Sequence, residues 1–345
     1  VIRYKSHNYR LLRANAGHFR YDSTKEYLNF EYFRVEERPR VLYIHPKYDI
    51  PVSSQWYPKG HLYPTQIAQY GLSHYSQWIK KQQHKQISHD IHKMDELISE
   101  VGSCSKSVTF NVSLSYSFVN FNLLSFSFNC SINFRFFFNG HYYKLMYFTK
   151  STLLPLKIRQ YTIIYGLNIT SDRKINRNLK IDLEKALKIK INEKYILFDV
   201  QLCEQCKIKQ FSIGNLTLYN EQAFFKSAEW LLTTQNDITG CWYMTIVRQF
   251  AQDYKLNPNW CSSMSQGLAA SLFIRMYSLT NEKKWLNGAL QAIKPFLSNS
   301  TAVKRYYDGR YLWLEEYPLD RNDSRSLYVL NGCLYSLLGL IDVHT

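Results

Sequence analysis

The stretch from Ile50 to Trp78, "IPVSSQWYPKGHLYPTQIAQYGLSHYSQW", is the most informative part of this chain. It has one lysine and no acidic residue, although the 345-residue chain has 43 Lys and Arg against 27 Asp and Glu. Within it, six side chains recur at the spacing of a helix face, which predicts a helix from Tyr63 to Gln82 after Pro64: Ile67, Tyr70, Gly71, His74, Tyr75 and Trp78. The stretch could form a core helix, a carbohydrate-binding face, or both.

The composition narrows the class of ligand. A formal charge of +16 attracts polyanions such as nucleic acid, acidic membrane or acidic polysaccharide. The 28 tyrosines suit wet, sugar-like ligands because each ring has a polar tip, although packing in strands and cores accounts for most of them. A nucleic-acid binder has only the charge in its favour, because the sequence contains no recognition motif for it.

Compartment signals come from sequons and cysteines. The sequence has no signal peptide or transmembrane run and begins Val1-Ile2-Arg3, so a membrane anchor is expected to be missing from this chain. Six N-x-S/T sequons favour the secretory pathway: Asn111, Asn129, Asn168, Asn215, Asn299 and Asn322. Seven scattered cysteines are an odd set and do not predict a disulfide framework, and Cys203-x-x-Cys206 has no second pair to complete a metal site.

Hydrophobic periodicity changes along the chain and predicts an α+β multidomain protein. Period-two alternation predicts strands before the linking helix and an antiparallel β-sandwich after it, where "LEKALKIK" allows one short helix. From Asn220 the pattern changes to paired amphipathic helices of the kind that build an α/α-toroid, which the four helices leave incomplete. The expected units are 1–62 (β-rich), 63–82 (linking helix), 100–219 (sandwich) and 220–345 (partial toroid).

Several motifs together resemble one family. The stretch from Ile50 closely resembles a signature of the D-glucuronyl C5-epimerases of heparan sulfate and heparin synthesis, and "WLEEYP" with "YVLNGCLYSLLGLID" resembles a second. "FEYFRVEERPRV", "SAEWLLTTQND" and "NWCSSMSQG" follow in the family's order. Between about residues 84 and 210 only strand character agrees. The resemblance implies an isomerase that converts D-glucuronate to L-iduronate in N-sulfated heparosan or heparan sulfate. It also implies a homodimer in the Golgi lumen, from a type II membrane parent.

The resemblance also implies roles for individual residues. Epimerisation at C5 removes a proton beside a carboxylate and returns one to the other face, so it needs a base on each face and cationic groups around the carboxylate. Glu316 would be one base and Tyr317 a hydrogen-bonding or relay group, whose phenol would need a pKa lowered by nearby Arg or Lys. The implied substrate-binding residues are Tyr9, Arg38, Gln55, Trp56, Arg248 and Asn331. From the sequence alone, Glu315-Glu316 would be a solvated acidic pair at a helix edge.

The chain departs from the family pattern at several points. The family's sequence continues past residue 345, and the tyrosines of its opposite catalytic face lie in that continuation. The chain as written is therefore expected to be a poor epimerase, with apolar side chains such as Leu334, Leu337, Leu338 and Leu340 lacking a partner helix. The alternative function is a catalytically impaired fragment that binds acidic glycans. No cofactor is required, and Gly214 replaces a carboxylate of the family's structural calcium site, which argues against calcium. Cys261 replaces a family tyrosine.

Overall fold

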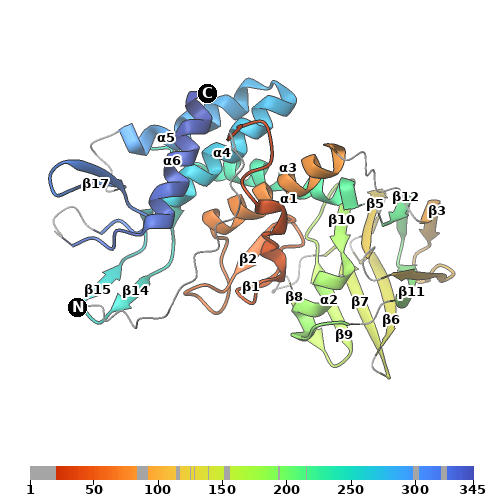
Figure 1. Cartoon of the computed structure of the whole chain (residues 1–345). Helices are drawn as coiled ribbons and strands as arrows, with labels where there is room; N and C mark the ends of the chain where they lie inside the picture. Colours follow the sequence, from red (N-terminus) through yellow and green to blue (C-terminus); the bar gives the residue numbers. More distant parts are fainter. Residues whose placement is uncertain are drawn as a thin grey trace.

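The computed structural model contains two β-sheets packed on one core and a group of long helices beside them (Figure 1). The N-terminal residues, including Tyr9, lie outside the described part of the chain, so the prediction for Tyr9 stays a prediction. The structure describes residues 21–83, 92–113, 117–124, 126–127, 129–138, 140–150, 156–192, 195–214, 216–297, 303–319 and 325–345.

The two sheets occupy the middle of the sequence. The four-stranded sheet has the order β10 (Arg173–Asn178), β5 (Phe118–Leu124), β12 (Cys206–Ile213), β3 (His92–Ser99). The six-stranded sheet has the order β4 (Val108–Ser113), β11 (Tyr195–Cys203), β6 (Ser131–Phe138), β7 (His141–Phe148), β9 (Thr162–Gly166), β8 (Leu156–Arg159). Every pair is antiparallel except β7 with β9, which is parallel.

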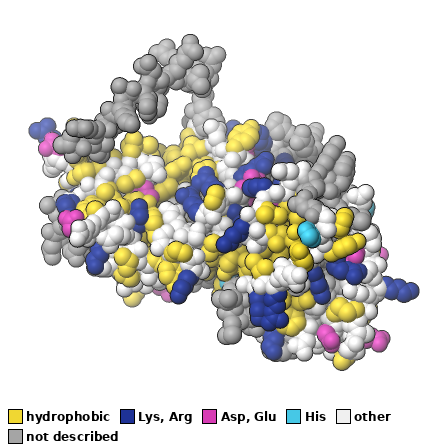
Figure 2. All heavy atoms as spheres, turned by 90° about the horizontal axis from the view of Figure 1, so that it is seen from below, with side chains coloured by type: hydrophobic (Ala, Val, Ile, Leu, Met, Phe, Trp, Pro, Cys, Tyr) yellow, Lys and Arg dark blue, Asp and Glu magenta, His cyan; other side chains and the backbone are white. Residues whose placement is uncertain are grey.

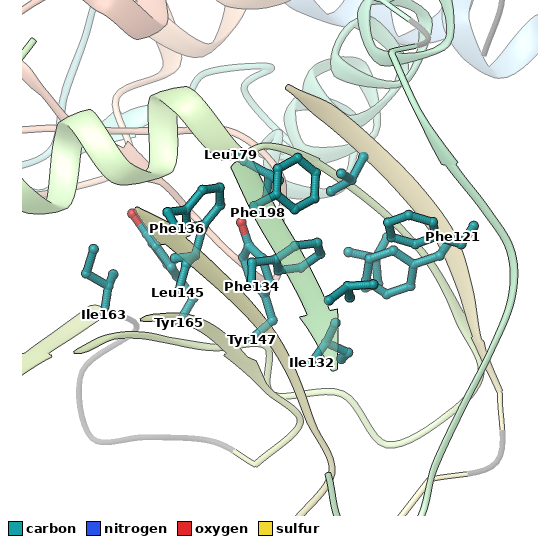
Figure 3. Close-up of a cluster of buried hydrophobic side chains, with 14 of the residues drawn as sticks. Phe121, Ile132, Phe134, Phe136, Leu145, Tyr147, Ile163, Tyr165, Leu179 and Phe198 are labelled. Atoms are coloured by element: carbon teal, nitrogen blue, oxygen red, sulfur yellow. The ribbon is translucent and has the colours of Figure 1, made fainter. Parts of the chain in front are cut away.

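Alternating side chains of both sheets meet in one hydrophobic core (Figure 3). Phe134 and Phe136 of β6, Phe198 of β11 and Phe121 of β5 are at most 1% exposed. The period-two pattern therefore did mark strands, because every second residue faces this core.

A helix interrupts the strands near "LEKALKIK", where the sequence allowed one short helix. Helix α2 (Leu179–Leu187) begins after Asn178, whose side-chain oxygen accepts a hydrogen bond from the backbone N–H of Ile181. Leu179, Leu183 and Ala186 recur at helical spacing and are buried in the same core as the sheets. The prediction of strands throughout 107–219 is wrong here, because this apolar stripe covers the core as a helix.

The N-terminal segment contains less strand than its alternating pattern predicts. Between residues 21 and 62, Phe30–Tyr32 and Val35–Glu37 are 3₁₀ helices, and β1 (Val41–Ile44) and β2 (Pro51–Ser53) form the one strand ladder. The predicted strands over this aromatic run are wrong because its rings pack on the helices: Phe30 joins the buried cluster that includes α1.

The helical part is built around α1 (Pro64–Gln83), which packs against α3 (Leu216–Thr234) and α4 (Ser263–Thr280). Helices α5 (Lys283–Leu297) and α6 (Leu330–His344) pack on α4. Helices α4 and α6 approach so closely that a Cβ atom at Gly339 would lie 2.3 Å from the carbonyl oxygen of Gly267. Among the described residues, no helix is long and apolar enough to cross a bilayer.

Burial explains why the opening stretch lacks charge. Helix α1 is buried on all sides along most of its length, including polar Gln66, Gln69 and Ser73. A Cβ atom at Gly71 would lie 2.3 Å from Leu272 of α4, so the helices are in close contact there. The prediction of one buried face was too narrow, because all faces of the helix are buried. A charged residue on any of them would require a buried partner, which explains the lack of charge.

Short strand pairs lie between the helices, so the C-terminal third is not all helical as predicted. They are β13 (Tyr243–Met244) with β16 (Trp260–Cys261), β14 (Arg248–Ala251) with β15 (Tyr254–Leu256), and β17 (Lys304–Tyr307) with β18 (Tyr311–Leu314). The helices begin at Leu216, four residues before the predicted change at Asn220. On α6, Leu334 and Leu337 are 50% and 44% exposed, whereas Leu338 and Leu340 pack against buried clusters.

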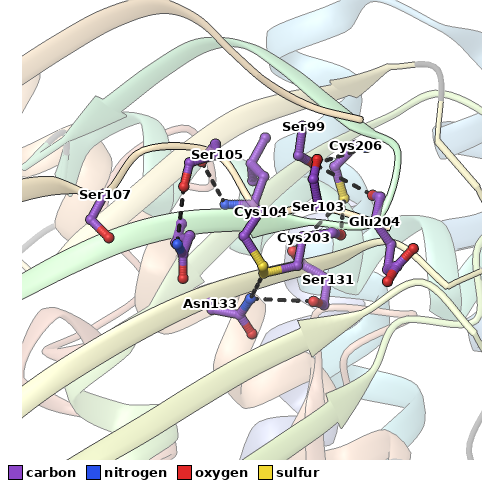
Figure 4. The surroundings of a disulfide bond; sticks show 12 residues. Ser99, Ser103, Cys104, Ser105, Ser107, Ser131, Asn133, Cys203, Glu204 and Cys206 are labelled. Carbon is purple, nitrogen blue, oxygen red and sulfur yellow. Dashed lines mark hydrogen bonds between the residues drawn. A yellow bond between two sulfur atoms is a disulfide. The ribbon is translucent and has the colours of Figure 1, made fainter. Parts of the chain in front are cut away.

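The cysteines form three disulfides, which the sequence interpretation missed. Cys104 pairs with Cys203, Cys130 with Cys206, and Cys241 with Cys261, while Cys333 is buried and unpaired. The two cysteines of the C-x-x-C motif thus bond to different partners across the sheets, and Figure 4 shows the Cys104–Cys203 bond. The odd count misled because one cysteine is a core residue, and the sequence separations of 99 and 76 residues gave no local signal.

One buried ion pair joins the N-terminal segment to the sheets and α2. Arg177 is 1% exposed and donates to both carboxylate oxygens of Asp182, at 2.8 and 2.6 Å. Its guanidinium also reaches the carboxylate of Asp49, at 3.4 Å, and the carbonyl of Ile44, at 3.1 Å. Tyr147 donates a further hydrogen bond to Asp182. Both charges are therefore held by several strong partners, as burial requires.

Replacing Asp182 by Asn should destabilise the fold by about 3–5 kcal/mol, because Arg177 would remain a buried cation without its main partner. Urea unfolding followed by circular dichroism measures the change. Asp199→Asn is the matched control: it breaks the 2.7 Å contact with Arg135, whose side chain is 46% exposed, and should cost below about 1 kcal/mol. Equal losses in the two variants would contradict the importance assigned to the buried pair.

The oxidised chain should contain one free thiol. Alkylation under denaturing, non-reducing conditions should label Cys333 alone, and peptide mapping by mass spectrometry should recover the three disulfide-linked pairs. Reduction should lower the thermal midpoint, since disulfides that close long loops typically contribute about 2–4 kcal/mol. Labelling of Cys203 or Cys206 in the oxidised protein would contradict the pairing.

Candidate functional site

Aromatic rings from three separate segments gather around Trp56. This residue lies in the loop after β2 with a φ of 65°. Its ring centroid is 5.4 Å from that of Tyr63, 5.7 Å from that of Tyr317 and 6.1 Å from that of Trp260. Phe250 of β14 completes the group, with its centroid 5.2 Å from that of Tyr317. We call these five residues the aromatic cluster.

Arg248 supplies the positive charge of this cluster. Its guanidinium carbon lies 4.6 Å from the ring centroid of Trp56, 4.4 Å from that of Phe250 and 5.9 Å from that of Tyr317. Arg248 and Phe250 are two residues apart on one strand, so their side chains share a face. Stacking on rings fixes the guanidinium plane, and one nitrogen donates to the carbonyl of Gln249 at 3.0 Å. The planar guanidinium suits a carboxylate or sulfate.

Two adjacent carboxylates between β18 and α6 have different surroundings. Glu315 accepts a hydrogen bond from Ser326 and lies 3.6 Å from Arg305. Glu316 is 5% exposed and packs against α6, where a Cβ atom at Gly332 would come within 2.4 Å of it. Burial raises the pKa of Glu316, and this effect is only partly offset by the hydrogen bond with Tyr317 and the charge of Arg248. The solvated acidic pair expected from the sequence is wrong, since both carboxylates are buried.

The tyrosines of the cluster are neutral hydrogen-bonding groups. Burial raises the pKa of Tyr317 well above its ordinary value, and Tyr63 and Glu316 raise it further, while Arg248 opposes them. Burial raises the pKa of Tyr63 in the same way. The expected lowering of the Tyr317 pKa by a nearby cation is therefore wrong in direction, because desolvation outweighs Arg248. Tyr317 can donate a hydrogen bond, and Glu316 is the group that can accept a proton.

Several buried polar atoms in this region have no hydrogen-bond partner among the described residues. They include Oε1 of Gln55, Nε of Arg248 and Oε2 of Glu316. Buried polar atoms are nearly always paired, and those that are not require an explanation such as a bound polar molecule. An acceptor, a donor and a carboxylate beside stacked rings form a set that could bind a charged sugar.

The remaining predicted residues lie around this group. Asn331 is exposed on the first turn of α6, directly before the Gly332 that contacts Glu316. Arg38 has other neighbours: its guanidinium carbon lies 3.5 Å from the ring centroid of Phe33, and its charge acts on Tyr335, one turn beyond Asn331. The structure thus brings Trp56, Arg248, Glu316 and Tyr317 together. Arg38 lies elsewhere, near Tyr335 in the second turn of α6.

Three members of the cluster, Tyr63, Phe250 and Trp260, were not identified as site residues from the sequence. Phe250 could have been found from its i, i+2 relation to Arg248. Trp260 lies within the quoted motif "NWCSSMSQG" but gives no independent signal, because its place depends on the pairing of β13 with β16. Within the described ranges, no group of three His, Cys, Asp or Glu side chains could hold a metal ion.

Comparison with known proteins shows a similarity to one family. Residues 235–345 match the family model described as "D-glucuronyl C5-epimerase C-terminus", a range that includes Arg248, Glu316, Tyr317 and Asn331. The chain is also 26% identical over 402 residues to the D-glucuronyl C5-epimerase of Caenorhabditis elegans, with 94% of this chain covered. It spans 63% of that relative's length. The chain is therefore similar to D-glucuronyl C5-epimerases, most specifically over residues 235–345.

Proposed function

We propose that this chain takes part in the C5 epimerisation of D-glucuronate to L-iduronate in N-sulfated heparosan or heparan sulfate. The observation that carries the proposal is the buried Glu316 carboxylate, with a raised pKa, beside Arg248 and Tyr317 in the aromatic cluster. The name of the Caenorhabditis elegans relative supports the reaction class.

The arrangement supports a specific division of labour. The Glu316 carboxylate takes the C5 proton, and the electron pair left behind spreads into the adjacent uronate carboxylate. Arg248 binds that carboxylate as its negative charge grows, and Trp56 stacks on the sugar ring. The phenol of Tyr317 remains protonated and orients Glu316. Inversion requires a proton from a donor on the opposite face, which is not among the residues assigned here, as the electron pair returns to C5. This chemistry requires no cofactor.

Cellular context and architecture are part of the proposal. Three disulfides support an oxidising compartment such as the Golgi lumen. The sequon residues Asn111, Asn129 and Asn168 are exposed, which supports glycosylation. We also propose that the two sheets form a β-sandwich, that α1 and α3 to α6 belong to an α/α-toroid, and that the chain acts as a homodimer without calcium.

A second candidate is glycan binding without turnover. Tyr63 and Tyr317 both have raised pKa values, so among these tyrosines and Glu316 only the carboxylate is suited to be a base. Inversion needs a second group on the opposite face, whereas glycan binding without turnover would leave the C5 proton of a bound uronate in place. The exchange experiment below distinguishes the two candidates.

Glu316→Gln should lower deuterium incorporation at C5 of N-sulfated heparosan in D₂O by about 10²–10⁴-fold, since a positioned base contributes that much. The exchange rate of the parent chain should rise with pH through a pKa above the ordinary carboxyl value, because burial raises that of Glu316. NMR or mass spectrometry measures the incorporation. Glu315→Gln is the control and should retain exchange, because Ser326 and Arg305 bind that carboxylate. No exchange in the parent chain would favour glycan binding without turnover.

Arg248→Ala should weaken binding of N-sulfated heparosan oligosaccharides by about tenfold or more, as expected for the loss of a charge-assisted hydrogen bond. Isothermal titration calorimetry at two salt concentrations measures the affinity. Lys283→Ala removes the same charge from an exposed position at the start of α5 and should change affinity little. If both substitutions weakened binding equally, Arg248 would contribute only through the overall positive charge of the chain and not through a specific contact.

A further inference from the structure

A second concave region lies away from the aromatic cluster, between β1, β8 and the end of α2. It has a volume of about 700 Å³. We call it the basic groove. Its lining residues include apolar side chains of all three elements and four lysines, with Lys59 contributed by the loop after β2. Figure 2 shows Lys and Arg side chains beside hydrophobic ones on the lower face of the molecule, where β1, α2 and β8 lie.

One half of the groove is apolar. Val41 and Leu42 come from β1, Ile158 from β8, and Ala186 and Ile189 from the end of α2. Ile158 and Ile189 are 46% and 38% exposed, although they border a cavity. Small-molecule sites are typically concave, of this size, and mostly apolar with a few polar groups that orient the ligand.

The other half is positively charged. Lys59 and Lys188 are exposed, and neither forms an ion pair with a carboxylate in the described part of the chain. Lys185 donates to the carbonyl of Arg38 at 2.7 Å, and burial together with the charge of Lys190 lowers its pKa to about 8. The acidic residues of the lining are already engaged: Glu184 accepts from Lys190 and the backbone of Ile191, and Glu37 from Arg34.

We propose that the basic groove binds an amphiphilic anion, a single molecule with an apolar chain and a carboxylate or sulfate at one end. The chain would cover Leu42, Ile158 and Ile189, and the acid group would lie among Lys59, Lys185 and Lys188. A sulfated polysaccharide fits less well, since it would leave the aliphatic wall in contact with water. The concave shape fits one molecule better than a bilayer surface.

The groove is separate from the candidate site but shares a loop with it. The loop after β2 carries Trp56 on the aromatic cluster and Lys59 on the groove, and Gly60 packs against Leu42, where an added Cβ atom would lie 2.8 Å from the leucine. The binding proposal does not depend on epimerase activity. It can therefore fail or succeed independently of the proposed function.

The test is fluorescence titration of the oxidised chain with 11-(dansylamino)undecanoic acid. We expect saturable binding at one site, displacement by dodecanoate, and little displacement by dodecylammonium, which has the same chain and the opposite charge. Lys59→Glu with Lys188→Glu should weaken binding about tenfold or more, and Ile158→Asp should do the same. Lys283→Glu is the control for overall charge and should leave the affinity unchanged.

All the substituted side chains are exposed, so the variants should fold, and their thermal midpoints and circular dichroism spectra verify this. Unchanged probe affinity in both groove variants would overturn the proposal. Equal displacement by dodecylammonium would show that the lysines do not select an anion. Displacement by a heparin oligosaccharide at lower concentration than dodecanoate would assign the groove to a polysaccharide and overturn it as well.

Discussion

The fold depends on the buried contact between Arg177 and Asp182. These residues are only five apart, on β10 and on α2, yet the guanidinium also reaches Asp49 and Ile44 in the N-terminal segment. A buried cation tolerates few arrangements of its partners, so this contact fixes where the hairpin of β1 and β2 meets the sheets. Arg275 of α4 has a similar role in the helical part, where it donates to Asp342 of α6 at 2.9 Å and to Tyr21 at 3.2 Å. Each buried arginine binds partners from distant parts of the chain.

This placement determines the site, because Trp56 lies in the loop that continues from β2. Its neighbours Arg248 and Tyr317 come from a hairpin and from the segment before α6, so three independent connections must be correct for the aromatic cluster to form. The Cys241–Cys261 disulfide lies in the same region and links the segment before β13 to Cys261 of β16, beside Trp260. This covalent link restrains one wall of the aromatic cluster.

The sequence predicted elements with strong periodicity better than elements held by distant partners. The linking helix was predicted at 63–82 and is found at Pro64–Gln83, because its apolar side chains recur regularly and Pro64 marks its start. The 3₁₀ helices, α2 and the short hairpins were missed or undervalued because packing decides them. The same limit applies to the site. Motif resemblance selected Trp56, Arg248, Glu316 and Tyr317 together, but the burial of Glu316 and the direction of the Tyr317 pKa depend on surroundings that no local pattern encodes.

The burial of Glu316 lowers the stability of the fold when the carboxylate is charged. Because its pKa is raised in the folded state, the folded chain binds more protons than the unfolded chain between the ordinary carboxyl pKa and the raised value. The free energy of unfolding therefore decreases as pH rises through that window. Burial destabilises the charged form of the carboxylate, which is the form that can accept a proton. Arg248 and Tyr317 reduce this cost without removing it. In the proposed reaction this cost has a benefit, because a base transfers a proton most efficiently when its pKa lies close to the working pH.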